Sequence, residues 1–378
     1  MLNLDRLSRE FSRQAAISSP SRREGAMASY LAERFSALGG IIEWDGTGAK
    51  IGGEADNLIV RFAATGRETA PLMLSVHMDT VEPCINVEPQ LCNGIFTSAG
   101  ETILGSDDKS GIAEIIEALE ILKEESIPHG PLEVVVTVCE EVGLLGAKHF
   151  DLERVASRRA IALDTSGIDK LILAAPAANK LKFVITGREA HAGIAPEAGI
   201  SAIVIAAQAL SQMRLGRIDF ETTANIGTIR GGIATNIIPR QIEMRGEVRS
   251  HDPVKLAAQT QQMVSAVESA VAAAARTIDG VLVSPEFFCE VISEYPSMSV
   301  AADSPLVLGV VAAAARLGRP LALLPGGGGS DANIFNALGI ETVILATGMT
   351  DVHTVNESVA LADMARVAEL LVEIIRSA

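Results

Sequence analysis

The stretch Leu132–Gly143, LEVVVTVCEEVG, is a mostly apolar run that ends in two adjacent glutamates, Glu140 and Glu141. Three other apolar runs also lead to acidic or histidine residues: Leu72–Val76 to His77 and Asp79, Ala160–Leu163 to Asp164, and Thr342–Ala346, through a glycine turn, to His353. Short apolar runs separated by helical stretches indicate buried parallel strands. Because ligands bind beyond the carboxyl ends of such strands, we expect these polar groups to converge on one edge of a sheet.

The pattern around these runs predicts one α/β domain interrupted by a smaller one. The first would have a mostly parallel sheet with helices on both faces, including two N-terminal helices within 4–38 and a helix over 105–123. After Asp164 the pattern changes, and we expect strands at 180–187, 222–231, 241–250 and 280–292 and helices at 199–213 and 253–276. This β-α-β-β-α-β order is typical of a ferredoxin-like α+β unit. The predicted domains are therefore 1–180 with 297–378, and an insertion at 181–296.

The composition restricts the partners and the location. The 378 residues are 48% hydrophobic and carry a formal net charge of −16, which argues against nucleic acid or an anionic membrane as the main partner. The first twenty residues contain no apolar segment of a secretory signal, and no apolar stretch reaches the ~18 residues of a membrane span. The four cysteines form no CxxC pair, so we expect reduced thiols and a cytoplasmic protein.

The polar groups at the strand ends, together with Asp107 at the start of the 105–123 helix, predict a metal centre. Two like charges at ~4 Å repel by roughly 4 kcal/mol at an effective dielectric constant of 20, so such a cluster needs protons or cations. Mixed histidine and carboxylate ligands suit Zn²⁺, with Mn²⁺ or Co²⁺ as alternatives. The charge balance favours two divalent ions with one aspartate between them.

Two short motifs suggest how the centre is completed. Adjacent side chains at a strand end diverge, so one of Glu140 and Glu141 can bind metal while the other acts as general base. His77 and Asp79 lie two residues apart on one face of a strand, so Asp79 can orient the imidazole.

Each of these groups also has a simpler structural interpretation. A lone histidine after a strand is more often structural, a Glu-Glu pair is usually solvated, and Asp107 and Asp108 can simply cap a helix. Only their occurrence together at equivalent strand ends favours the metal site. We expect structural roles for the remaining histidines His129, His149 and His251, whereas the residue pattern leaves His191 open.

The glycine-rich segment Pro325–Asp331, PGGGGSD, has two equally supported interpretations. Its backbone amides can bind an anion, or it is a tight turn capped by Asp331. The GxxxxGK[ST] sequence of a nucleotide-binding P-loop is absent from the chain.

Taken together, the motifs resemble those of the zinc aminoacylase and carboxypeptidase G superfamily, and within it those of peptidase T-like members. The matching blocks occur in family order over nearly the whole chain: SVHMDT, ILGSDDKSGIAE, VTVCEEVGLLGAKHF, ALDTSG, EAHAGIAPEAGISA, TNIIP, GGGSDANIFNALGI and DVHTVNE. The resemblance implies His77 and Asp164 on one metal ion and Glu141 and His353 on the other. Asp107 would bridge the two ions.

The resemblance also implies roles for five further residues. Glu140 would be the general base, with Asp79 supporting His77. The inserted domain would act as a lid and form a homodimer, in which His191 reaches the partner subunit's site and stabilises the oxyanion. Asn236 and Arg249 match positions that hold the substrate backbone or carboxylate.

The function implied is that of a cytoplasmic dinuclear zinc exopeptidase that hydrolyses short peptides, as a tripeptide aminopeptidase does. A hydroxide bridging the two ions would attack the amide, with Glu140 moving the proton. One alternative is an N-acyl-amino-acid or related amidohydrolase that uses the same centre. Two others are a non-catalytic metal-binding dimer and a structural α/β protein that binds no metal.

Overall fold

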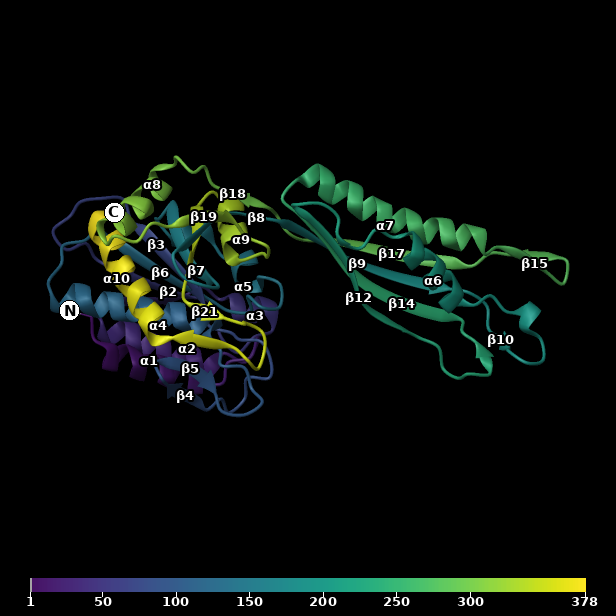
Figure 1. Ribbon diagram of the computed structural model, residues 1–378, viewed down its shortest axis with the longest axis horizontal. Helices are drawn as coiled ribbons and strands as arrows, with labels where there is room; N and C mark the ends of the chain where they lie inside the picture. Colours follow the sequence, from purple (N-terminus) through teal and green to yellow (C-terminus); the bar gives the residue numbers. More distant parts are fainter. Residues whose placement is uncertain (1) are drawn as a thin grey trace. The chain divides into compact units, whose positions relative to one another are not determined.

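The computed structural model describes residues 2–378, and the chain divides into two compact units (Figure 1). Unit 1 comprises Met1–Ala175 and Met298–Ala378, and unit 2 comprises Pro176–Ser297. The second unit is therefore inserted between two parts of the first. Within residues 2–378, no helix is both long enough and apolar enough to cross a membrane.

Unit 1 is built on a nine-stranded sheet with the order β1-β2-β6-β3-β7-β20-β8-β18, to which β19 adds by pairing with β8. The strands are β1 (Ile41–Trp44), β2 (Leu58–Phe62), β3 (Leu72–His77), β6 (Leu132–Thr137), β7 (Arg159–Thr165), β8 (Lys170–Ala175), β18 (Met298–Ser299), β19 (Ala322–Pro325) and β20 (Glu341–Ala346). The four strands predicted from the apolar runs, β6, β3, β7 and β20, are neighbours and run parallel. Their carboxyl ends therefore lie along one edge of the sheet, as the sequence predicts.

Helices cover both faces of this sheet because its strands alternate their side chains between two cores (Figure 1). Ile161 and Leu163 of β7 belong to the main core with residues of α2, α4, α8 and α10, whereas Ala162 packs with Ala332 of α9 on the other face. The helices of unit 1 are α1 (Leu4–Ala16), α2 (Gly25–Ala37), α3 (Thr47–Ile51), α4 (Ser106–Glu124), α5 (Leu145–Lys148), α8 (Pro305–Arg316), α9 (Asp331–Ala337) and α10 (Leu361–Ser377). The predicted α/β class is confirmed.

A small antiparallel sheet in unit 1 carries the last predicted ligand. Its strands are β4 (Pro89–Cys92), β5 (Ile95–Ser98), β21 (Met349–Thr350) and β22 (Ser358–Ala360), in the order β21-β22-β5-β4. Met349 pairs with Val359 and Thr350 with Ser358, so residues 351–357 form the loop of a hairpin. This hairpin loop contains His353.

Unit 2 consists of a five-stranded antiparallel sheet, β11-β12-β14-β9-β17, with two helices packed against it. Its main elements are β9 (Ala177–Thr186), α6 (Ala202–Gln212), β11 (Gly216–Arg217), β12 (Thr222–Gly231), β14 (Gln241–Ser250), α7 (Pro253–Ala273) and β17 (Glu286–Tyr295). The shorter strands are β10 (Ala190–His191), β13 (Ile237–Ile238), β15 (Arg276–Ile278) and β16 (Val281–Val283). The longer elements follow the β-α-β-β-α-β order of a ferredoxin-like unit.

The predicted strand at 280–292 and the predicted end of the preceding helix are wrong. Residues 276–283 instead form the β15–β16 hairpin, and the last long strand begins only at Glu286. The hairpin turn is Asp279-Gly280, in which both residues have positive φ, as a two-residue hairpin turn requires. Because β15 begins at Arg276, α7 ends at Ala273 rather than at residue 276.

Candidate metal centre

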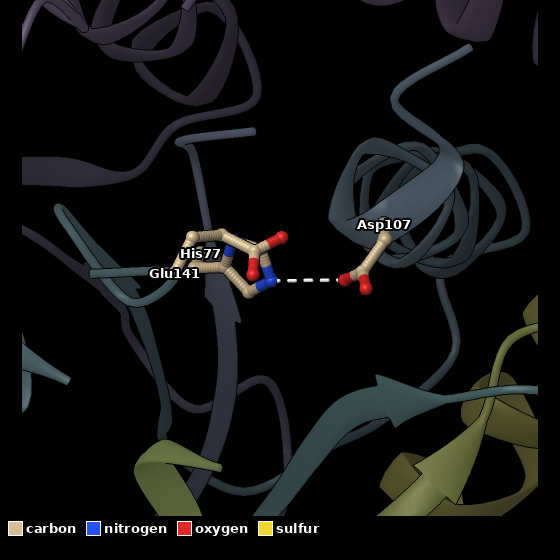
Figure 2. A group of neighbouring side chains, drawn as sticks. All are labelled: His77, Asp107 and Glu141. Atoms are coloured by element: carbon tan, nitrogen blue, oxygen red, sulfur yellow. Dashed lines mark hydrogen bonds and ion pairs between the residues drawn. The ribbon is translucent and has the colours of Figure 1, made fainter. Parts of the chain in front are cut away.

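The ends of β3 and β7 and the start of α4 meet around the imidazole of His77. Figure 2 shows His77 with Asp107 at the start of α4. The Nε2 atom of His77 lies 3.0 Å from Oδ1 of Asp107 and 3.9 Å from Oδ1 of Asp164. His77 is buried, and its other ring nitrogen, Nδ1, lies 2.9 Å from the backbone oxygen of Asp79. Its Nε2 atom is thus directed at two carboxylates.

A second histidine approaches the same aspartate from the β21–β22 hairpin loop. The Nε2 atom of His353 lies 3.2 Å from Oδ2 of Asp107 and 3.0 Å from Oε1 of Glu141. The two oxygens of Asp107 are therefore divided between the two histidines. Potential ligand atoms of His77, Asp107 and Glu141 all lie within 4.8 Å of one another (Figure 2).

Local backbone geometry places these side chains. Gly105, with φ of +76°, precedes α4, and Asp107 and Asp108 depart from helical φ and ψ, so the regular helix follows them. The sequence pattern places both aspartates in the first turn of a regular helix. In the structure they instead precede the regular helix. His353 itself has a φ of +64°, which turns the hairpin loop sharply at the ligand position.

Three carboxyl groups at the centre, those of Asp164, Glu140 and Glu141, resist ionisation. Burial, reinforced by the nearby Asp107 charge, raises the pKa of Asp164 to about 8. Burial and the charge of Asp164 raise the pKa of Glu140 well above its ordinary value, and burial also raises the pKa of Glu141. Such shifts mark a cluster of negative charge that lacks sufficient positive charge around it.

Asp107 and the two histidines shift in the opposite sense. Although burial opposes it, hydrogen bonds with His353 and His77 keep the pKa of Asp107 below its ordinary value. Hydrogen bonds to Asp107 and Glu141 raise the pKa of His353 to about 10. The pKa of His77 is also raised, against the effect of burial, by Asp107 and Asp79. Nitrogen and carboxylate donors directed at one another in this way are a ligand set suited to Zn²⁺.

The Glu140-Glu141 turn is held by two buried carboxylates from other segments. Oδ1 of Asp79 accepts a hydrogen bond from the backbone N–H of Glu140 (2.9 Å), and Oδ2 accepts one from Glu141 (3.2 Å). Oε1 of Glu24 accepts the backbone N–H of the preceding Cys139 at 3.1 Å. Asp79, which the sequence assigns to His77, also lies beside that ring: its Oδ1 atom is 3.5 Å from Nδ1, and its backbone oxygen is 2.9 Å from the same atom.

The glycine-rich segment Pro325–Asp331 leads into α9, and Ser330 rather than Asp331 caps this helix. The Ser330 side chain accepts a backbone hydrogen bond, and Asn333 completes a reciprocal capping box. The Ser330 hydroxyl also hydrogen-bonds to Asp164, which links this loop to the centre. Asp331 is buried, and burial raises its pKa to about 6.

Sequence reasoning gave Glu24 and Glu357 no role and Asp108 only that of a helix cap, although all three border the centre. Oδ2 of Asp108 accepts the backbone N–H of His77 at 3.2 Å. Glu357 accepts hydrogen bonds from the start of α4. Their partners are mainly backbone amides of distant segments, which leave no pattern in the sequence. Asp108 and Glu357 lie within two recognised motifs, SDDKSG and DVHTVNE, and this was the only available signal. Glu24 lies in neither motif.

The three remaining predicted residues belong to unit 2. His191 is exposed on β10, which pairs with β13, and the N–H of Ala192 donates to the backbone oxygen of Asn236 at 2.9 Å. Arg249 lies near the end of β14, where its guanidinium pairs with Glu247 at 2.9 Å. His191 and Asn236 are thus neighbours, whereas Arg249 is at the opposite end of the sheet.

Comparisons with known proteins all find similarity to peptidases or to proteins that match the whole chain. The model of the family described as Peptidase family M20/M25/M40 matches residues 73–377. The uncharacterised protein YqjE of Bacillus subtilis is 41% identical over 379 residues, covering 100% of both chains.

Two solved structures cover the whole chain. Aminopeptidase PepT from Bacillus cereus is 40% identical with a TM-score of 0.89, covering 100% of this chain and 99% of its own. A tripeptidase from Staphylococcus aureus is 36% identical with a TM-score of 0.93, covering 100% and 98%.

Proposed function

This chain belongs to peptidase family M20/M25/M40, and from that premise we propose that it is a metal-dependent aminopeptidase that hydrolyses short peptides. The observation that carries this proposal is the division of the Asp107 carboxylate between two histidines, one beside Asp164 and the other beside Glu141. This arrangement matches a centre for two ions that share one aspartate. The names of the solved aminopeptidase and tripeptidase relatives support a short peptide as the substrate.

We assign two divalent ions to this centre, with Zn²⁺ as the first candidate and Mn²⁺ or Co²⁺ as alternatives. His77 and Asp164 would hold one ion, Glu141 and His353 the other, and Asp107 both. When bound, the ions would supply Lewis acidity and ease the deprotonation of the attacking water.

Glu140 is the proposed general base. It is buried beside Asp164, and its raised pKa suits a carboxylate that takes a proton and releases it again. Asp79 and Glu24 fix the backbone from which this side chain projects. In the proposed reaction, Glu140 removes a proton from the attacking water and then donates it to the leaving amine.

We propose that substrate contacts come from two subunits of a homodimer. The β10–β13 ladder, which carries His191, lies beyond the Gln241 end of the β9–β14 pairing. From Gln241 to Arg249, β14 rises roughly 26 Å, at about 3.3 Å for each of eight steps. His191 and Asn236 therefore cannot contact the same small substrate as Arg249 of the same chain. We therefore propose that Arg249 and the His191–Asn236 pair reach one substrate from different subunits, with His191 serving the partner subunit.

The surface of unit 2 supports dimer formation. On its outer side, β12 pairs only with β11, at Thr223 and Ala224, so the rest of this strand is an open sheet edge within residues 2–378. Ile229 on that edge and Ile203 on α6 are large apolar residues exposed by 50% and 44%. An open apolar edge is a ready surface for pairing with a second copy.

The proposed location is the cytoplasm. All four cysteines are free thiols, which supports a reducing compartment. The net charge of −16 supports a small-molecule substrate over nucleic acid or an anionic membrane.

The test of the function is metal content by elemental analysis, combined with hydrolysis of a tripeptide panel before and after chelation. We expect about two metal ions per chain and cleavage that stops on chelation and returns with Zn²⁺. Two ions with cleavage of N-acetylated amino acids only would favour the amidohydrolase alternative. A chain that binds no metal after reconstitution would refute the proposal.

A further inference from the structure

Glu357 is the one side chain of the β21–β22 hairpin loop, residues 351–357, that is fully buried. It lies four residues after His353, whose side chain is half exposed. A carboxylate is costly to bury without partners, so its hydrogen bonds indicate why it is there.

The carboxylate of Glu357 receives four hydrogen bonds from consecutive residues at the start of α4. Oε2 accepts the backbone N–H groups of Leu104 (2.9 Å) and Gly105 (2.8 Å). Oε1 accepts the hydroxyl of Ser106 (2.7 Å) and the backbone N–H of Asp107 (3.0 Å). Each carboxylate oxygen therefore accepts two hydrogen bonds. One of the four donors is Asp107, the residue that both His77 and His353 approach.

We propose that Glu357 is a positioning residue that locks the hairpin loop carrying His353 to the backbone of Asp107, and so sets the metal affinity of the centre. The inference rests on the proposed function, because it assigns metal to these residues. Metal sites require ligands held within about 0.5 Å. Within residues 2–378, no other residue connects these two segments through as many hydrogen bonds as the four of Glu357. Loss of a group that supports a ligand typically weakens metal binding by about 10–100-fold.

Glu357→Gln is the decisive variant because it preserves the shape of the side chain. One carboxylate oxygen becomes an NH₂ group, which cannot accept hydrogen bonds, so two of the four donors lose their partner. A matched control is Glu133→Gln on β6. Glu133 is also buried and accepts the backbone N–H groups of Ala156 and Ser157 and the Ser157 hydroxyl; it also lies 3.8 Å from the Arg61 guanidinium. It is near the other end of β6 from Glu140.

The measurement is the Kd for Zn²⁺ of the metal-free full chain, by competition with a chromogenic chelator, together with the melting temperature of each metal-free protein. We expect Glu357→Gln to weaken Zn²⁺ binding about 10–100-fold, while Glu133→Gln binds Zn²⁺ within twofold of wild type despite a similar loss of thermal stability. Equal Zn²⁺ affinity in Glu357→Gln and wild type would overturn the inference.

If Glu357→Gln does not fold, the test variant becomes Ser106→Ala, which removes the hydroxyl that donates to Glu357. Zn²⁺ binding weakened several-fold would support the inference, and unchanged binding would overturn it. A wild-type chain that binds no Zn²⁺ would refute the proposed function itself, which distinguishes the two failures.

Discussion

Asp107 and Glu140 lie at the same centre but have opposite electrostatic surroundings. Asp107 is flanked by two imidazoles that favour its charged form, whereas Glu140 is buried beside other carboxyl groups that disfavour it. A group kept ionised by two histidines is suited to bind cations. A group that holds a proton readily is suited to transfer one, so substitutions at these residues should have separable effects.

We expect Glu140→Ala to lower kcat by on the order of 10²–10⁴ or more while the protein keeps its metal. Asp107→Ala should lose metal and activity together, because it removes the group shared by both proposed ions. Elemental analysis and steady-state kinetics on the two purified variants check this prediction. Equal metal loss in both variants would reverse the assignment of roles.

At the scale of elements, the edge strand β12 is the feature with the clearest consequence. Ile229→Asp places a charge on the open edge and should dissociate the proposed dimer. Because His191 would then be missing from the partner's site, kcat should fall in step with the dimer fraction. Sedimentation or light scattering at several protein concentrations, alongside kinetics, measures both.

The control for this variant is Val254→Asp, in the first turn of α7, where the side chain is 75% exposed and lies on a different element. It adds the same charge and should leave both mass and kcat unchanged. A monomeric wild type with full activity would contradict the dimer proposal.

How far the sequence predicts these elements depends on the kind of interaction. The four apolar runs predict their strands because burial on both faces makes them continuous in sequence. Asp279 and Gly280 were missed as a hairpin turn because the flanking apolar residues also fit one long strand. Glu357 was missed because its four partners include three backbone N–H groups, which every sequence possesses.

At the scale of the whole molecule, the clustered carboxylates of the proposed metal centre should make the stability of the folded state depend on bound cations. A ligand that binds only the folded state at 100 times its Kd stabilises it by about 2.7 kcal/mol per site, or roughly 5–10 °C in Tm for a domain of this size. Removing metal with a chelator should therefore lower the Tm of unit 1. Calorimetry with and without added Zn²⁺ tests this, and an unchanged Tm would argue against structural coupling.

The metal-free protein should also lose stability as pH rises from 6.5 to 8. Asp164 and His353 both have folded-state pKa values, about 8 and about 10, above their ordinary values of 3.8 and 6.5. Between pH 6.5 and 8 the unfolded state has already lost the Asp164 proton and is losing the His353 proton, whereas the folded state still binds both. The unfolded state therefore binds fewer protons, and stability falls as the pH rises. Thermal melts of the chelated wild type should show this slope, and Asp164→Asn should reduce it.

The order of the site residues along the chain also has a consequence during protein synthesis. His77, Asp107, Glu141 and Asp164 all precede the inserted unit, whereas His353 and Glu357 follow it. At about 5–20 residues per second, the ribosome needs roughly 10–40 s to proceed from Asp164 to His353. Throughout that interval the nascent chain lacks one proposed ligand and the residue that we propose positions it, so we expect the peptidase to stay inactive until the ribosome has passed Glu357.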